Sequence, residues 1–181
     1  ASNIAITAGA SASILLVLMT LFNEGDHVAI ALPGYPCYRN IIKALSLKPY
    51  IIKTKIKDNF QLDSNDIANM PSYVKGIIIE SPANPTGVVI NNDDLYKIVE
   101  ICKKKKIKLI ADEIYHGISY DLQKPNSVLK YNKNCVVINS FSKYFSMTGW
   151  RLGWIIADDK IIENISKIAM NLYLSPSSVS Q

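Results

Sequence analysis

Polar and charged side chains follow several short apolar segments of the sequence, each at the point where the segment ends. One run leads into Pro33-Gly34-Tyr35, and another into a loop that contains Asn84-Pro-Thr-Gly87. Asp112 comes directly after a third run, and Ser140-Phe-Ser-Lys143 closes a fourth. In open α/β sheets, ligands bind beyond the carboxyl ends of the strands. An aromatic ring, an amide, an acid and a lysine are therefore expected to meet at one edge of a sheet.

One further segment of the sequence suits an anion. Gly9-Ala10-Ser11 joins the first apolar segment to a helical pattern, and the free N–H groups of a helix start can hold an anion such as phosphate. The same edge of the sheet is therefore expected to carry a phosphate cradle.

Alternating strands and helices must position these groups. Strands are predicted over residues 3–7, 28–32, 76–80, 107–111, 135–138 and 152–157, with an extended segment over 50–56, and helices over 11–22, 35–45, 92–105 and 160–172. Short apolar runs separated by helices are typical of a mainly parallel sheet covered on both faces. The sequence therefore predicts one α/β domain with three α/β/α layers.

Composition narrows the class of protein. The 181 residues carry a formal net charge of +5, which is too weak for nucleic-acid binding without a clustered basic patch. Hydrophobic residues make up 49% and charged residues 19%, which excludes a disordered chain. The longest apolar run, 14–19, is too short to span a bilayer. Cys37, Cys102 and Cys135 lack metal-ligand spacing and suit a reducing compartment, so we expect a cytoplasmic protein without a metal site.

The two ends of the sequence predict a piece of a longer protein. The chain starts at Ala1 without a methionine, one step before an expected strand. It stops at Gln181, just after a Ser-Pro-Ser-Ser run that is typical of a helix start.

Taken together, the motifs resemble the class I/II aminotransferases. Ser140-Phe-Ser-Lys143, eight residues before Arg151 within Met147-Thr-Gly-Trp-Arg-Leu-Gly153, is similar to the pyridoxal-phosphate attachment region of that family. Asn84-Pro-Thr-Gly87 and Asp112-Glu-Ile-Tyr115 match the family in order and approximate spacing. The resemblance covers nearly the whole chain. It implies that residues 1–181 are the large, cofactor-binding domain of the aspartate-aminotransferase fold, without the N-terminal segment and the C-terminal small domain.

The resemblance also implies a role for each candidate residue. Lys143 would form a Schiff base with pyridoxal 5′-phosphate, and Asp112 would pair with the pyridine nitrogen. Tyr115 and Asn84 would bond the phenolic oxygen, while Tyr35 would stack on the ring. The phosphate would be held by the backbone of Ala10 and Ser11, the hydroxyls of Ser140 and Ser142, and Arg151.

The implied activity is transfer of an amino group from an amino acid to a 2-oxo acid, by a homodimer in the full-length protein. The isolated chain is expected to be inactive, because the family grips the substrate with an arginine of the small domain and with residues of the partner subunit. Two alternatives remain: a carbon–sulfur lyase or synthase of the same fold, and a non-catalytic ligand-sensing domain of a regulator. A dinucleotide-binding domain is excluded, because no G-x-G-x-x-G motif follows the first strand.

Overall fold

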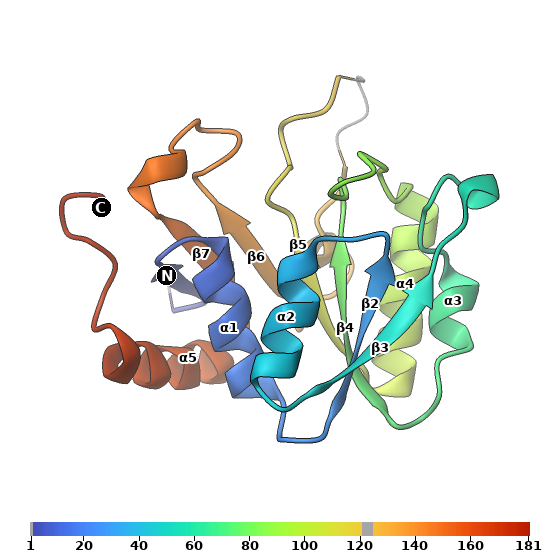
Figure 1. Ribbon diagram of the computed structural model, residues 1–181, viewed down its shortest axis with the longest axis horizontal. Helices are drawn as coiled ribbons and strands as arrows, with labels where there is room; N and C mark the ends of the chain where they lie inside the picture. Colours follow the sequence, from blue (N-terminus) through green and yellow to red (C-terminus); the bar gives the residue numbers. More distant parts are fainter. Residues whose placement is uncertain (1, 121–124) are drawn as a thin grey trace.

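The computed structural model describes residues 2–120 and 125–181, and within them seven strands form one sheet in the order β1-β7-β6-β5-β4-β2-β3 (Figure 1). The strands are β1 Ile4–Thr7, β2 His27–Leu32, β3 Lys48–Lys53, β4 Val74–Glu80, β5 Lys108–Asp112, β6 Val136–Ser140 and β7 Gly153–Ile156. The helices are α1 Ala10–Leu21, α2 Pro36–Ala44, α3 Ser64–Ala68, α4 Asn92–Lys105 and α5 Asp159–Leu172, with short 3₁₀ turns at Ile56–Asp58, Val128–Lys130 and Thr148–Trp150.

The sheet is parallel through its centre and antiparallel at one edge. Strands β3, β2, β4, β5 and β6 pair in parallel, which confirms the predicted α/β class. Strand β7 pairs antiparallel with both β6 and β1. Because β4, β5 and β6 run the same way, the loops that follow them rise from one edge of the sheet, at the top of Figure 1.

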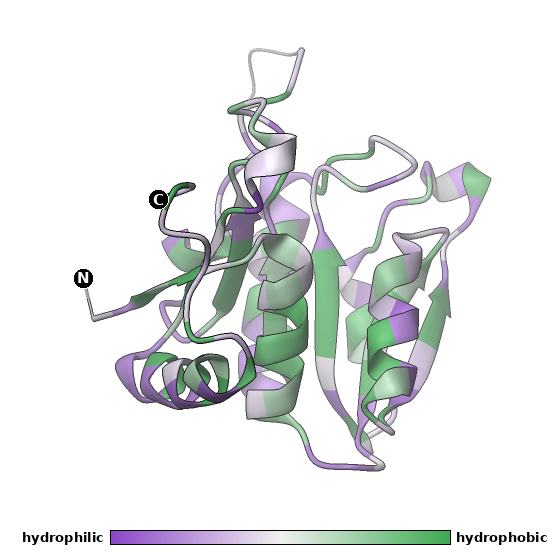
Figure 2. Cartoon of the chain, turned by 60° about the vertical axis from the view of Figure 1, so that its left-hand side comes forward, coloured by the Kyte–Doolittle hydropathy of each residue, from purple (hydrophilic) through white to green (hydrophobic). Residues whose placement is uncertain are grey.

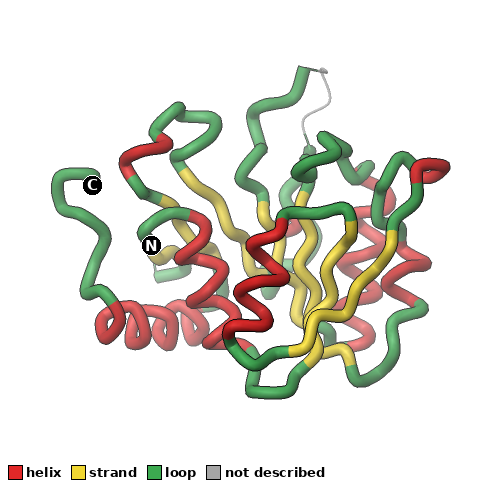
Figure 3. The backbone as a smooth tube through the Cα atoms, viewed as in Figure 1, coloured by secondary structure: helices red, strands yellow, loops and turns green. Residues whose placement is uncertain are grey.

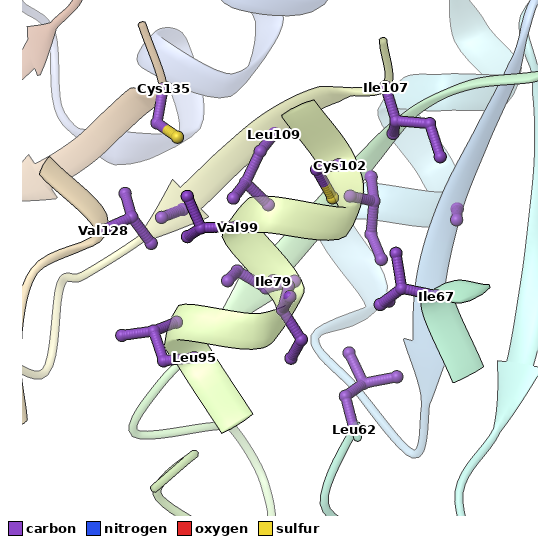
Figure 4. Close-up of a cluster of buried hydrophobic side chains, with 14 of the residues drawn as sticks. Leu62, Ile67, Ile79, Leu95, Val99, Cys102, Ile107, Leu109, Val128 and Cys135 are labelled. Carbon is purple, nitrogen blue, oxygen red and sulfur yellow. The ribbon is translucent and has the colours of Figure 1, made fainter. Parts of the chain in front are cut away.

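Helices cover both faces of the sheet, as Figure 3 shows in outline. On one face α3 and α4 enclose a core cluster that includes Ile67, Ile79, Val99 and Leu109 (Figure 4). On the other face α1, α2 and α5 enclose a second cluster, with Leu18 at its centre. Each face of the central strands is therefore dry, which explains why these strands are apolar runs rather than alternating ones.

Helix α1 is apolar on almost all sides because it is covered on almost all sides. Ile14, Leu16, Val17 and Leu18 are fully buried, between the sheet and the neighbouring helices α2 and α5. Figure 2 shows this helix as largely hydrophobic along its length. A helix in the middle of a layer has no solvent face to make polar. The helix that carries the expected anion site is thus anchored in the core.

One local feature differs from the sequence-based expectations. Helix α3 was not expected, although Asp63 and Asp66 form a reciprocal capping box at its start. Near the C-terminus, where a helix start is expected, the backbone N–H groups of Ser180 and Gln181 donate to the Ser177 carbonyl at 3.0 and 3.3 Å and form a single turn. At helix α4 the cap is Asn91, whose Oδ1 accepts a hydrogen bond from the backbone N–H of Asp94 at 2.9 Å.

None of the helices in the described part of the chain is long and apolar enough to cross a membrane.

Candidate active site

An open cavity of about 150 Å³ lies beyond the carboxyl ends of β4, β5 and β6, against the start of α1. Nine of the ten candidate residues line it, and the full lining is Ala10, Ser11, Ile14, Tyr35, Glu80, Asn84, Asp112, Ile114, Tyr115, Ser142, Lys143, Thr148 and Arg151. Residues more than a hundred positions apart in the sequence therefore meet around one space.

Asp112 is the buried acid of this cavity. It is the last residue of β5 and is only 3% exposed. The Tyr38 hydroxyl donates to its Oδ2 at 2.8 Å, and the backbone N–H of Ile114 donates to its Oδ1 at 3.1 Å. Burial raises the pKa of Asp112 to about 6, and the two hydrogen bonds oppose that rise. The carboxyl group is held in one orientation and is ready to pair with a cationic or N–H group of a ligand.

Asn84 and Tyr115 face each other across the loops after β4 and β5. The Asn84 side-chain Nδ2 lies 3.4 Å from the Tyr115 hydroxyl oxygen. Lys143 lies beside them, with its Nζ atom 5.7 Å from the centre of the Tyr115 ring. Burial raises the pKa of Tyr115, so its hydroxyl stays protonated at neutral pH and can donate a hydrogen bond. An amine, an amide and a phenol thus approach one part of the cavity.

Tyr35 supplies an aromatic wall. It is the N-cap residue of α2, and its ring packs edge-on against Tyr38 with centroids 5.5 Å apart and planes at 84°. The contact with a buried ring restrains the orientation of Tyr35. An aromatic ring restrained in this way offers a face on which a flat ligand can stack.

The anion end of the cavity is formed by the start of α1 and by Arg151. Gly9, the N-cap residue, has a φ of 86°, and its side-chain position is filled by Arg151: a Cβ there would lie 2.6 Å from a guanidinium nitrogen. Arg151 also donates from Nη1 to the Thr148 carbonyl at 3.0 Å. The free N–H groups of the first turn and a guanidinium therefore lie together, a combination that suits phosphate.

The loop after β6 places Ser142 and Lys143. The backbone N–H of Phe141 donates to the Leu152 carbonyl at 3.1 Å, and Thr148 Oγ1 donates to the Ser142 carbonyl at 2.8 Å. Ser140 lies behind this loop rather than on the cavity surface. Its Oγ donates to the Leu152 carbonyl at 2.8 Å and lies 2.7 Å from Ser142 Oγ. In this arrangement Ser140 supports Ser142.

Glu113 forms hydrogen bonds with two neighbouring segments of the chain. The backbone N–H of Val128 donates to its Oε1 at 3.0 Å, and Asn139 Nδ2 donates to its carbonyl oxygen at 3.0 Å. Burial raises the pKa of Glu113 to about 7. His116 Nδ1 lies 3.5 Å from its Oε2. These contacts join the ends of β5 and β6, which carry Asp112 and the lysine loop.

Sequence reasoning overlooked two residues of the site. Tyr38 lies one helical turn after Tyr35, a spacing that puts both rings on the same side of α2. Glu80 is the last residue of β4 and pairs in register with Asp112. The signal for Glu80 was a carboxylate at the end of an otherwise apolar strand. In the described residues, no group of three or more His, Cys, Asp or Glu side chains is arranged to hold a metal ion.

Two solved structures resemble this fold closely. An aminotransferase from Mycobacterium tuberculosis superimposes with a TM-score of 0.95 at 39% identity, over 99% of this chain and 47% of that one. Thermus thermophilus aspartate aminotransferase with maleate gives a TM-score of 0.95 at 21% identity, over 99% and 47% of the two chains, which compares the fold alone.

Sequence comparison agrees. The chain is 38% identical over 179 residues to valine–pyruvate aminotransferase of Mycobacterium tuberculosis, covering 98% of this chain and 46% of that protein. It is 37% identical over 182 residues to aspartate aminotransferase of Sulfolobus acidocaldarius, covering 97% and 45%. The chain thus spans about half the length of these relatives. Residues 1–181 match the family described as aminotransferase class I and II, and the chain belongs to that family.

Proposed function

We propose that the full-length protein transfers an amino group from an amino acid to a 2-oxo acid, with pyridoxal phosphate attached through a Schiff base on Lys143. One observation carries the proposal: Lys143, Asp112 and the anion end formed by α1 and Arg151 line a single cavity. The relatives named above are aminotransferases, which supports the same reaction class.

The residues present fit the proposed cofactor. Its phosphate would be held by the backbone N–H groups at the start of α1, by Ser142 and by Arg151, where the guanidinium fills the space beside Gly9. Its ring would lie against Tyr35, and the buried carboxyl of Asp112 suits a ring N–H group. When bound, pyridoxal phosphate supplies an electron sink for the negative charge that develops at the substrate Cα.

The residues of this chain then divide the work. The Asp112 carboxylate holds a proton at the ring nitrogen, a task for which its two hydrogen bonds already orient it. Asn84 and Tyr115 would bind the phenolic oxygen. The Lys143 amine would take the proton from the substrate Cα, as a general acid–base group. Its position beside Tyr115 keeps the amine at this end of the cavity.

The full-length protein is further proposed to be a homodimer of the cytoplasm. Cys37, Cys102 and Cys135 are all free thiols, which supports a reducing compartment. The relatives' names include valine–pyruvate and aspartate aminotransferases, so the substrates are proposed to be an α-amino acid and a 2-oxo acid. Incubation of the full-length protein with single amino acids and a 2-oxo acid other than pyruvate tests this choice, because transamination yields a new amino acid, whereas a lyase yields pyruvate and ammonia.

Reduction with borohydride tests the role of Lys143. Full-length protein saturated with pyridoxal phosphate is treated with borohydride, digested and analysed by mass spectrometry. The expected result is one modified peptide, containing Lys143, that disappears in Lys143→Ala. Lys97→Ala, which removes an exposed lysine on α4, is the matched control and should leave the labelling unchanged. Labelling spread over many lysines, or undiminished in Lys143→Ala, would refute the assignment.

A further inference from the structure

Two carboxyl groups lie side by side at the edge of the sheet. Glu80 ends β4 and Asp112 ends β5, and the two residues are direct partners in the parallel register. Residues in register on neighbouring strands point to the same face. Both residues line the candidate active-site cavity. The acid assigned to the ring nitrogen therefore has a second acid as its neighbour.

In the described part of the chain, no cationic side chain forms an ion pair with either acid. Within residues 2–120 and 125–181, the ion pairs are formed by other residues, and neither Glu80 nor Asp112 has a Lys, Arg or His nitrogen within salt-bridge distance. Two neighbouring carboxyl groups in a partly desolvated site repel each other when both are ionised, which favours retention of one proton by the pair. The structure around each group indicates which one keeps the proton.

Asp112 has the environment of the charged partner and Glu80 that of the neutral one. Asp112 accepts hydrogen bonds from the Tyr38 hydroxyl at 2.8 Å and from the backbone N–H of Ile114 at 3.1 Å. Glu80 accepts a hydrogen bond from the backbone N–H of Asn84 to Oε2 at 3.1 Å. The Tyr38 hydroxyl is also close enough to Glu80 to favour its charged form, but burial outweighs this effect at Glu80.

Glu80 also has apolar surroundings on its other side. It also lines a small second cavity of about 30 Å³, whose walls include the side chains of Leu62, Ile78 and Ile90. Burial raises the pKa of Glu80 to about 8, compared with about 6 for Asp112. The order of these two pKa values agrees with the hydrogen bonding.

We propose that Glu80 is a positioning residue that works as a neutral carboxylic acid. It holds the backbone of Asn84 through Oε2, and by keeping its proton it leaves Asp112 as the single negative charge for the ring nitrogen. The role assigned to Asp112 rests on the proposed function, whereas the protonation of Glu80 is a property of the protein alone.

Three tyrosines are the titratable groups most strongly coupled to Glu80, besides Asp112. Tyr38 on α2, Tyr35 at its N-cap and Tyr115 after β5 are electrostatically coupled to Glu80, and burial raises the pKa of each above the usual value for tyrosine. Lys143 and Arg151 also line the cavity, but neither forms an ion pair with Glu80 in the described part of the chain. The pKa of Asp112 is raised less by burial than that of Glu80, because its hydrogen bonds favour the charged form. A change between about pH 7 and pH 9 that depends on Glu80 therefore reports Glu80 itself.

The first experiment measures protonation by thermal unfolding. Melting temperatures of the full-length wild type and Glu80→Gln are compared from about pH 5 to pH 9, with and without added pyridoxal phosphate. A carboxyl whose pKa is raised in the folded state stabilises at low pH, and that stabilisation is lost as pH rises towards the folded pKa. Glutamine has no such titration. The melting temperature of Glu80→Gln minus that of the wild type should therefore grow with pH up to about 8 and then level off.

Glu24→Gln, which removes an exposed carboxyl group at the turn before β2, is the matched control and should show a flat difference. A flat difference for Glu80→Gln above about pH 6 would overturn the inference, since it would mean that Glu80 is already ionised.

The second experiment tests whether the hydrogen bond from the Asn84 backbone to Glu80 supports cofactor binding. In Glu80→Gln the side-chain amide oxygen can accept the same backbone N–H, whereas Glu80→Ala removes the acceptor. The dissociation constant for pyridoxal phosphate near pH 7 should therefore be about tenfold higher for Glu80→Ala than for Glu80→Gln. Equal dissociation constants would overturn the positioning role. Failure of the proposed function is seen separately, in the borohydride labelling of Lys143, which neither Glu80 measurement uses.

Discussion

The hydrogen bond from Tyr38 to Asp112 can be removed without disturbing the core around it. Tyr38 is 4% exposed, and its hydroxyl lies 2.8 Å from Asp112 Oδ2. Tyr38→Phe deletes the hydroxyl and keeps the ring, which packs against Tyr35 and the second core cluster. The substitution therefore changes the electrostatic environment of Asp112 while leaving the shape of the site intact.

The size of the effect follows from that geometry. A hydrogen bond to a charged, buried group contributes about 1.5–3 kcal/mol. Because one pKa unit corresponds to about 1.4 kcal/mol, loss of the bond should raise the pKa of Asp112 by about one to two units. The direction is upward, since the hydroxyl donates to the ionised carboxylate and favours it. From a starting value of about 6, the ionised fraction near neutral pH falls to about half or less.

Titration with pyridoxal phosphate measures this change. The dissociation constant of the full-length protein is determined from about pH 5 to pH 9 for the wild type, Tyr38→Phe and the control Tyr96→Phe, which removes a half-exposed hydroxyl on α4. Affinity should fall on the acid side as Asp112 gains its proton. In Tyr38→Phe this fall should occur about one to two pH units higher, and in Tyr96→Phe it should not move. A profile of Tyr38→Phe that superimposes on the wild type would refute the reasoning.

Two further predictions concern the support of the site and of the core. In Gly153→Ala the new Cβ would lie 2.8 Å from the Asn139 carbonyl oxygen and 2.9 Å from the backbone of Gly9, so the loop that begins α1 must shift. We expect the free energy of unfolding in urea to fall by about 1–3 kcal/mol and the binding of pyridoxal phosphate to weaken. Lys105→Met removes an ammonium group that donates to three carbonyls at the end of α3. The free energy of unfolding in urea should fall by about 1–2 kcal/mol, while cofactor binding stays unchanged. A variant as stable as the wild type would contradict this prediction.

Much of the site was predictable because its residues sit at the ends of elements with strong local signals. Asp112 and Lys143 follow buried apolar runs, and Ala10 and Ser11 begin a helix after a glycine. Parallel strands bring their carboxyl ends to one edge, so the prediction that these residues converge needed only the order of strands and helices. The short helix α3 could not be predicted from the sequence, because five residues show too little hydrophobic periodicity even with a capping box at the start.

Tertiary packing decided the contacts that tune the site. The partner of Asp112 is Tyr38, 74 residues away, and that pairing depends on how α2 docks on the sheet. The pairing of Glu80 with Asp112 depends on the register of β4 against β5, and the antiparallel edge depends on where β7 turns back along β6. The sequence determined which residues can do chemistry, because helix and strand signals act over a few neighbours. Proton affinities were decided by the folded structure alone, because they depend on burial and on neighbouring charges that only long-range packing brings together.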